Sequence, residues 1–386
     1  MTGWAAEGSI DIELILTTGM ITEVRITNRR PLGATAVLAG RPAAEVPELV
    51  SRLFSVCRIA QGIAAARAME AACGKPADAA QETARQVLLL GETVLEHATR
   101  AVFDWPMLLG EAPAAGEVKA LRGALTNLHR VLYPDGDWMC PGGGRLAPDL
   151  QALAERLATV GAVLDRAVFG GASGFDGPER DDWARQGRTA AARLFARLAA
   201  GGLEGFGASE AAPLPVLSAP ALNARMAADR DGSFLALPEW TGTVHHTGPL
   251  ARQADSRAVA RALAEHGCGV LAHGTARLVE LVLSLREMRD FCGTLCEHDG
   301  VPTAPAEGCG LAIVEAARGR LVHRAEVQEG NVTRYQILAP TEWNFRPDGA
   351  LARGLIGRPG GDDPAWRARL LVTALDPCVA FSLRVS

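Results

Sequence analysis

The 386-residue sequence contains no long hydrophobic run and no basic, apolar leader. Without a run of about 18 apolar residues it offers no membrane-spanning helix, so we expect a soluble cytoplasmic protein with no membrane insertion. It also lacks an excess of positive charge, since 39 Lys and Arg face 44 Asp and Glu for a net charge of −5. We therefore expect no nucleic-acid partner.

Aromatic residues and cysteines are both scarce. Aromatics make up 5% of the chain, and its eight scattered cysteines exclude a disulfide-rich secreted fold and favour a reducing compartment. Hydrophobic residues still reach 48%, which is enough for a large core at this length. We expect one mainly helical α+β domain over residues 1–386. Its expected parts are a hairpin and helix (1–75), a helical core (76–200), a loop-rich segment (201–250), and helices with a second hairpin (251–386).

Periodicity places the first elements of this domain. Alternating apolar residues over 9–27, around a Thr18-Gly19 turn, predict an N-terminal hairpin. Apolar residues at helical spacing over 45–73 predict one helix that ends before Gly74 and carries Cys57 on its apolar face. Further helices are expected at about 80–103, 149–168, 180–199, 256–266 and 275–292.

The second half of the chain is predicted to end in a capped helix. Residues 201–221, with three prolines and two glycine-rich stretches, are typical of a linker or a long loop. A second hairpin is expected near 311–339. Asp363-Pro364 should cap a final helix. Pro377 should end that helix and present Cys378 to the core.

Several fragments occur in an order that is found in a known family. "RLFSVC" ends in Cys57 and "LVTALDPC" ends in Cys378, and "EGSIDIE", "TGPLARQ", "VEAARG" and "PTEWNFRP" are spread along the chain. These fragments resemble motifs of the [NiFe]-hydrogenase large-subunit family, over residues 1–75 and 245–386. "CPGGG" (140–144) resembles a Gly-Gly loop of that family. The resemblance implies a large-subunit-like helical core with peripheral hairpins and small sheets.

The departures from the family pattern decide the expected chemistry. In the family, nickel and iron are held by two Cys-x-x-Cys pairs, but here one position of each pair is phenylalanine, Phe54 and Phe381. Phenylalanine cannot bind a metal, so we expect no nickel and no hydrogenase activity. The histidine that helps to hold magnesium in the family is Arg384, and its acidic partner falls near Thr35. Hard cations require oxygen ligands, so we expect no magnesium.

Other positions of the family site are retained. By the resemblance, Cys57 matches a bridging ligand of the metals and Cys378 a terminal one, so we expect both to contact a metal. In the family, the iron carries cyanide and carbon monoxide, which lie against the positions of Arg318, Pro340 and Thr341. A buried cyanide nitrogen needs hydrogen bonds, which gives the guanidinium and the hydroxyl a physical reason to persist together.

The pattern is similar to that of HupK/HoxV-type accessory members of the family, which act in hydrogenase maturation. The resemblance implies a non-catalytic scaffold that transiently holds an Fe(CN)₂CO unit. Its partners would be maturation chaperones and the precursor of a hydrogenase large subunit. The alternatives are a catalytic large subunit with an altered site and a metal-free structural paralogue. Glu7 matches the glutamate that passes protons in active relatives and is interpreted as a relic of that path.

Two further groups of residues are weaker candidates for metal binding. Cys292, Cys296 and His298 form a C-x-x-x-C-x-H cluster at the end of a predicted helix, where two thiols on one face could bind zinc. No second Cys or His pair stands at a zinc-finger distance, so a core face followed by a helix-end histidine is the preferred interpretation. His245-His246 has no partner at ligand spacing, and we interpret the pair as loop histidines.

Overall fold

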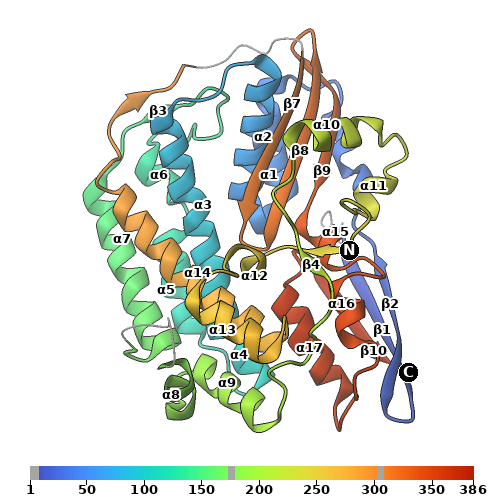
Figure 1. Cartoon of the computed structure of the whole chain (residues 1–386). Helices are drawn as coiled ribbons and strands as arrows, with labels where there is room; N and C mark the ends of the chain where they lie inside the picture. The colour runs from blue at the N-terminus through green and yellow to red at the C-terminus, as the bar shows by residue number, and fades with distance from the viewer. Residues whose placement is uncertain (1–7, 173–178, 302–307) are drawn as a thin grey trace, which may run out of the picture.

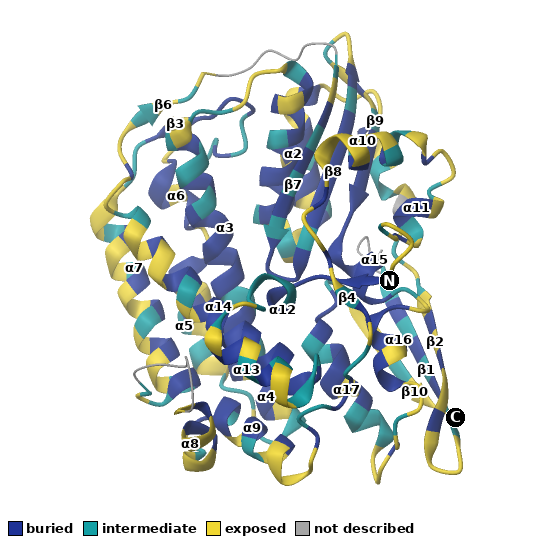
Figure 2. Ribbon diagram, in the orientation of Figure 1, coloured by how far each residue is buried: buried dark blue, intermediate teal, exposed yellow. Residues whose placement is uncertain are grey.

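The computed structural model describes residues 8–172, 179–301 and 308–386, which form a helical body with four small sheets. Most long helices lie on one side of the molecule and the two three-stranded sheets on the other (Figure 1). Helix α3 (Ala79–Thr99) is largely buried, whereas α7 (Leu150–Val163) turns an exposed face outward (Figure 2). The predicted class, an α+β fold with a mainly helical core and small peripheral sheets, is confirmed.

The predicted N-terminal hairpin is present and carries an additional strand. Strands β1 (Ser9–Thr17) and β2 (Met20–Asn28) pair antiparallel around Thr18 and Gly19, which both have positive φ angles. A strand that the sequence did not predict, β10 (Ala380–Val385), runs parallel to β1 and completes the sheet order β10-β1-β2. The pairing places the first and the last of the described strands side by side in one sheet. Side chains of β1 that enter the core are Ile10, Ile12 and Leu14.

The single helix predicted over 45–73 is wrong, because the chain bends in its middle. Helix α1 (Val46–Leu53) and helix α2 (Arg58–Cys73) are separated by Phe54 and a short 3-10 turn that contains Cys57. Phe54 has a φ of −119° and a ψ of 74°, which lie outside the helical region. Cys57 is therefore the residue before α2 and not part of the apolar face of a continuous helix.

A carboxylate from α3 holds the start of α2 in place. The two carboxylate oxygens of Glu92 accept hydrogen bonds from the backbone N–H groups of Ile59 and Ala60, at 2.8 and 3.0 Å. Backbone N–H groups in the first turn of a helix have no partner within that helix, so an acceptor there stabilises a new helix start. The break after Phe54 thus depends on a residue that lies on another helix.

No single helix within 8–172, 179–301 and 308–386 is both long and apolar enough to cross a membrane. The segments Ala43–Leu53 and Ser55–Cys73 meet the length and composition criteria only when they are taken together. A bend of 104° separates them.

Most of the predicted helices of the central body are confirmed. Helix α14 (Val270–Phe291) begins earlier than the predicted residue 275, and it packs against α3. Asp78 caps α3 by accepting hydrogen bonds from two backbone N–H groups of its first turn. The other predictions correspond to α3 with a π-helical turn (Arg100–Asp104), α7 with a π-helical turn (Leu164–Phe169), and α13 (Arg257–His266).

The helix predicted over 180–199 is wrong, because it is two helices. Helices α8 (Glu179–Gln186) and α9 (Ala190–Ala200) are separated at Gly187, whose φ of 61° ends α8. Thr189 then caps α9 by accepting a hydrogen bond from its first turn. Helices that the sequence did not predict are α4 (Trp105–Leu108), α5 (Ala115–Leu125), α6 (His129–Leu132), α10 (Ala219–Ala228), α11 (Ser233–Ala236), α12 (Pro249–Arg252), α15 (Pro340–Asn344) and α16 (Ala350–Leu355).

The hairpin predicted near 311–339 is a three-stranded antiparallel sheet. Strands β7 (Gly308–Ala316), β8 (Gly319–Gln328) and β9 (Asn331–Leu338) follow each other in space as in sequence. Helix α2 packs closely on β7, where a Cβ at Gly310 would lie 1.9 Å from a main-chain oxygen of α2. Glycine is needed at this position because the two backbones approach so closely.

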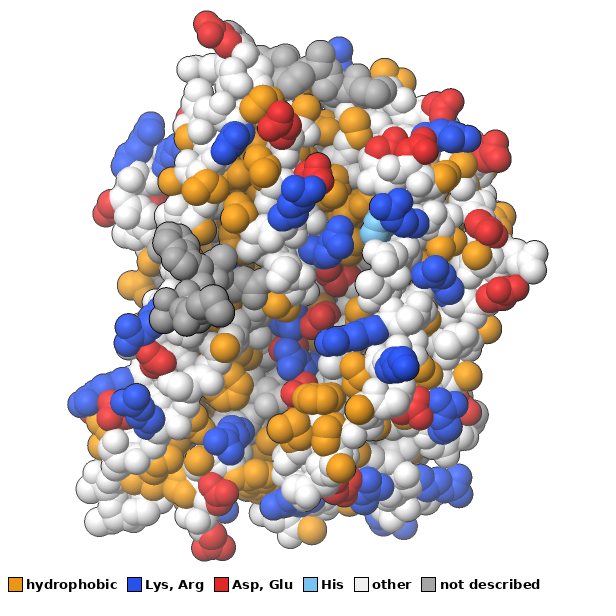
Figure 3. Space-filling model, turned by 180° about the vertical axis from the view of Figure 1, so that it is seen from behind, with side chains coloured by type: hydrophobic (Ala, Val, Ile, Leu, Met, Phe, Trp, Pro, Cys, Tyr) orange, Lys and Arg blue, Asp and Glu red, His pale blue; other side chains and the backbone are white. Residues whose placement is uncertain are grey.

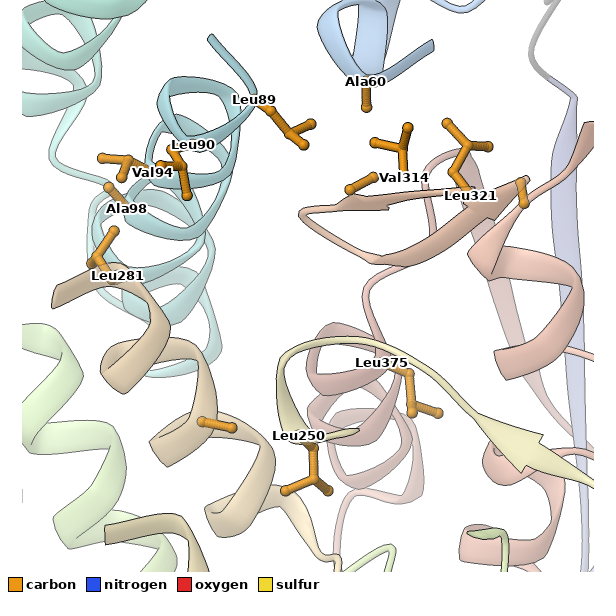
Figure 4. Packing of buried hydrophobic residues seen from close by; sticks show 14 of the residues in the cluster. Ala60, Leu89, Leu90, Val94, Ala98, Leu250, Leu281, Val314, Leu321 and Leu375 are labelled. Atoms are coloured by element: carbon orange, nitrogen blue, oxygen red, sulfur yellow. The ribbon is translucent and has the colours of Figure 1, made fainter. Parts of the chain in front are cut away.

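The main hydrophobic core joins the sheet side to the helical side. Figure 4 shows Ala60 of α2 above Val314 and Leu321 of the sheet, and Ala98 of α3 beside Leu281 of α14. All five side chains belong to one buried cluster. The core therefore ties α2, which follows Cys57, to both halves of the molecule.

The segment 201–221, predicted as a linker or long loop, is a packed connection with little regular structure. It contains β4 (Ala212–Pro213), which pairs parallel with β5 (His245–His246). Its buried side chains include Leu203, Phe206, Leu214 and Leu217. The remaining two-stranded sheet pairs β3 (Arg145–Leu146) with β6 (His298–Asp299).

The predicted final helix is confirmed together with its cap. Helix α17 (Pro364–Leu375) begins at a proline, and Asp363 accepts a hydrogen bond from the Trp366 N–H at 2.8 Å. Asp376 follows the helix with a φ of 55°, a left-handed conformation that turns the chain sharply. The turn at Asp376 and Pro377 leads directly to Cys378.

Candidate metal centre

Two cysteines from opposite ends of the chain line the same small cavity. Cys57 comes from the break between α1 and α2, and Cys378 comes from the turn after α17. The cavity between them has a volume of about 10 Å³. Its other lining residues are Arg30, Phe54, Val56, Gln61 and Val379.

A hydrogen-bonding side chain lies beside each thiol. The Thr341 hydroxyl lies 3.0 Å from Cys378 Sγ, and it also accepts a hydrogen bond from the Cys378 N–H at 3.4 Å. Gln61 Nε2 donates to Cys57 Sγ at 3.6 Å. Burial, and then the nearby charges of Cys378 and Glu92, raise the pKa of Cys57, so the thiol keeps its proton when no metal is present.

Arg318 reaches the site from the turn between β7 and β8. Its Nη2 donates to Glu96 Oε2 at 2.6 Å and its Nε to Asp376 Oδ1 at 3.3 Å. Its Nη1 is buried and has no hydrogen-bond partner within the described ranges. Burial alone would lower the pKa of Arg318, but the charges of Asp376 and Glu96 raise it well above its usual value. A permanently charged donor without a partner thus lies close to the thiols.

Asp376, directly before Pro377-Cys378, is surrounded by guanidinium groups. Besides Arg318, Arg100 approaches Asp376 Oδ1 to 2.9 Å and Arg277 approaches Oδ2 to 3.6 Å. Although burial would raise the pKa of Asp376, these charges hold it well below its usual range. Arg277 also donates to two main-chain oxygens at the end of α17. This charge cluster fixes the turn that presents Cys378.

The two phenylalanines at the positions of the missing cysteines lie in different environments. Phe54 is 9% exposed and forms part of the wall of the thiol cavity. Phe381 is 37% exposed on β10, where it pairs with Ile10. Arg384 lies on the same exposed strand, whereas Thr35 donates to the main-chain oxygen of Tyr335 at 3.0 Å. Arg384 and Thr35 are thus held by different sheets.

A larger cavity of about 710 Å³ lies between the α1–α2 break, α3 and α5. Arg318, Glu92 and Glu96 line it together with apolar side chains, and Val56 lines both this cavity and the thiol cavity. The face seen in Figure 3 is hollowed near its middle, where positive and negative side chains lie close together. Val56 is therefore a side chain that the two cavities share.

Sequence reasoning missed four residues of this centre: Arg30, Gln61, Glu92 and Glu96. The two glutamates could have been noticed, since they lie one turn apart within the apolar stretch "VLLLGETVLEHA". Burial raises the pKa of Glu92 to about 7, against the effect of its two backbone hydrogen bonds. Arg30 and Gln61 give no comparable signal, because only the folded chain brings them to the thiols.

The remaining sequence candidates lie elsewhere. Cys292 donates to the main-chain oxygen of Met288 at 3.3 Å, Cys296 is exposed, and His298 contacts Asp78 at 3.3 Å. In the part of the chain that the structure describes, no group of three or more His, Cys, Asp or Glu is placed to hold a metal. Pro340, a neighbour of Thr341, is buried at the start of α15. Glu7 lies outside the described residues.

The interpretation of His245 and His246 as loop histidines is wrong. Both are buried in β5, and the ring of His246 lies 5.8 Å from that of His273. Burial lowers the pKa of His246 to about 4. The pairing of β5 with β4 is non-local, so the spacing of residues around the two histidines could not reveal it.

The chain is similar to known proteins in both sequence and fold. Residues 207–383 match the family model described as nickel-dependent hydrogenase. The chain is 30% identical to the hydrogenase expression/formation protein HupK of Rhizobium leguminosarum bv. viciae, covering 100% of this chain and 98% of the relative. It is 33% identical to HoxV of Cupriavidus necator, covering 93% and 92%. The reduced Ni-Fe-Se hydrogenase of D. vulgaris Hildenborough has the same fold, with a TM-score of 0.69 at 19% identity over 94% of each chain.

Proposed function

Because the chain belongs to the family of hydrogenase expression/formation proteins that includes HupK, HupV and HoxV, we propose that it acts in hydrogenase formation as a non-catalytic scaffold. Its cargo is an iron that carries two cyanides and one carbon monoxide. Cys57 and Cys378 bind the iron, and Arg318 and Thr341 donate hydrogen bonds to the cyanide nitrogens. The protein receives the cargo from maturation chaperones and passes it to the precursor of a hydrogenase large subunit in the cytoplasm.

The observation that carries this proposal is the convergence of two thiols and an unpaired guanidinium donor. Thiolate sulfur is a soft ligand that suits low-spin iron. The buried Nη1 of Arg318, which has no partner within the described residues, needs an acceptor, and a cyanide nitrogen is one. A second metal would require further ligands, and at the corresponding positions this chain has phenylalanine.

The size of the thiol cavity sets a condition for loading. A volume of about 10 Å³ is at the lower limit of what a single water molecule needs, so the iron unit cannot enter unless a lining side chain moves. Val56 lines both the thiol cavity and the 710 Å³ cavity and is 37% exposed. Movement of the short turn that carries Val56 would open the thiols to the larger cavity. Cargo would then leave by the same route.

Infrared spectroscopy tests the proposal. Protein isolated anaerobically from cells that make a hydrogenase should show cyanide and carbon monoxide stretching bands. Cys57→Ala and Cys378→Ala should each remove the bands, because losing a metal ligand removes the site. Cys140→Ala is the matched control, since this half-buried cysteine lines neither cavity. Unchanged bands in both variants would favour a metal-free structural role, and hydrogen uptake by the purified protein would favour a catalytic subunit.

A further inference from the structure

A second buried guanidinium faces the two thiols through the small cavity. Arg30 follows β2, and its side chain is 9% exposed. It lines the cavity together with Cys57 and Cys378, whereas Arg318 lines the larger cavity. The two arginines therefore line different cavities.

Arg30 retains a hydrogen-bond donor for a group in this cavity. Its Nη1 donates to Glu342 Oε1 at 2.5 Å, but its Nε is buried and has no hydrogen-bond partner among residues 8–172, 179–301 and 308–386. Burial would lower the pKa of Arg30, whereas negative charge on Cys378, on Glu342 and on Cys57 raises it, the two cysteines acting in this way once they are metal-bound thiolates. An unpaired charged donor in a buried cavity is costly unless a bound group accepts its hydrogen bond.

Charge distinguishes the metal groups that two thiols can hold. When two neutral thiols bind a bare divalent cation, two protons leave, two sulfur–metal bonds form, and the net charge of the site stays zero. When they bind iron(II) that carries two cyanides and one carbon monoxide, two protons also leave, but the site gains two negative charges. No electron is transferred in either case. A buried dianion needs nearby positive charge, whereas a neutral thiolate–cation site does not.

We propose that Arg30 selects cyanide-bearing iron over a bare divalent cation by donating from its Nε to the anionic unit that the thiols hold. This inference rests on the proposed function and deepens it. Arg318 is expected from the family resemblance, but Arg30 belongs to none of the motifs that carry it. The residue thus gives this thiol pair a preference that its sulfur atoms alone cannot provide.

The variants must distinguish the loss of the Arg30 donor from the loss of its ion pair with Glu342. Arg30→Met alone would leave Glu342 buried and unpaired, which can prevent folding. The test variant is therefore Arg30→Met/Glu342→Gln, and Glu342→Gln alone keeps the guanidinium. The matched control is Arg85→Met/Glu70→Gln. It removes an equally buried pair, at 2.8 Å, that lines neither cavity.

Two measurements on the same proteins test the selection. Infrared spectra of protein isolated anaerobically from hydrogenase-producing cells report the cyanide-bearing iron. Titration of metal-free protein with Co²⁺ alone, followed by sulfur-to-cobalt charge-transfer absorption, reports a bare cation. In Arg30→Met/Glu342→Gln the cyanide bands should fall about tenfold or more, as for a lost charged hydrogen bond, while the Co²⁺ dissociation constant changes less than about threefold. Arg30→Lys should recover part of the band intensity.

The possible outcomes separate the inference from the proposed function. Full bands in Arg30→Met/Glu342→Gln would overturn selection by Arg30 and leave the scaffold function standing. Equal losses of the bands and of Co²⁺ affinity would show a purely structural role and would also overturn it. Loss of the bands in the control variant Arg85→Met/Glu70→Gln would likewise show a purely structural effect and would overturn selection by Arg30. If wild-type protein from these cells shows no bands, the proposed function fails and this inference fails with it.

Discussion

Cys57 and Cys378 lie together at one cavity, whereas the phenylalanines at the other two cysteine positions lie apart from each other. The thiols share one cavity, and Phe54 belongs to its wall. Phe381 is 37% exposed on β10 and pairs with the first sheet. The two thiols are therefore held together in one buried cavity, whereas Phe54 lies in its wall and Phe381 lies on an exposed strand. The two thiols thus share a buried cavity that Phe381 does not line.

The turn that carries Cys378 is held by a cluster of buried charges. Asp376 is buried among Arg100, Arg277 and Arg318. Buried charge clusters are poor sources of stability, because apolar residues of similar volume often stabilise a fold equally well. The presence of this cluster beside Cys378 favours a role in positioning the turn that carries the thiol.

The largest effect is expected from removing both thiols. Cys57→Ala/Cys378→Ala should abolish support for hydrogenase formation, because no ligand for the cargo remains. Hydrogen uptake in extracts of complemented cells measures this. Cys140→Ala should support formation at the wild-type level. Full hydrogen uptake with the double variant would remove the functional difference between the two halves of the site.

Removal of the central carboxylate should cost stability. Asp376→Asn leaves three guanidinium groups without their common partner and should lower the free energy of unfolding by about 3–5 kcal/mol in urea denaturation. Since the pKa of Asp376 is depressed by folding, this stabilisation is present above the unfolded value of about 3.9 and is lost as the pH falls below it. Asp104→Asn, at a more exposed carboxylate that also contacts Arg100, is the control. A similar fall in the free energy of unfolding for both variants would contradict the stabilising role of Asp376 in the charge cluster.

The two phenylalanines should respond to the same substitution in different ways. Phe54→Ala removes a buried ring and should cost about 3–4 kcal/mol, whereas Phe381→Ala at an exposed position should cost about 0.5 kcal/mol. Thermal and urea unfolding of the two variants measure the difference. Equal costs would mean that Phe381 packs as tightly as Phe54 in solution.

A smaller, pH-dependent effect is expected at the start of α2. The folded pKa of Glu92, about 7, exceeds the unfolded value of about 4.3, so the folded state binds the proton more tightly. The free energy of unfolding should therefore fall as the pH rises from about 4.3 to 7, by up to about 3 kcal/mol. Glu92→Gln should remove this slope in urea unfolding at pH 5 and pH 8. Glu48→Gln, at an exposed carboxylate of α1, should leave it unchanged.

The sequence predicted the local parts of the fold better than the non-local ones. The N-terminal hairpin and the capped helix before Asp376 follow from alternation and capping residues near in sequence. The break at Phe54 could not be predicted, because helical spacing continues through it and its stabilising acceptor, Glu92, lies on another helix. Strand β10 could not be predicted either, since it pairs with residues at the opposite end of the chain.

The residues of the candidate site also fall into those that the sequence predicted and those that it did not. Cys57, Cys378, Arg318 and Thr341 were expected from motifs, and the folded chain brings them together. Arg30 and Gln61 belong to no such motif, and they reach the cavity only through the packing of β2 and α2 around it.

Metal content tests the central claim, that the iron half of the site is kept and the nickel half lost, most directly. Protein purified anaerobically from hydrogenase-producing cells would be analysed for iron and nickel by mass spectrometry. The account predicts iron at up to about one atom per chain and no nickel, because two thiolates hold one iron but cannot hold a second metal. Nickel in stoichiometric amounts, together with hydrogen uptake by the purified protein, would contradict it.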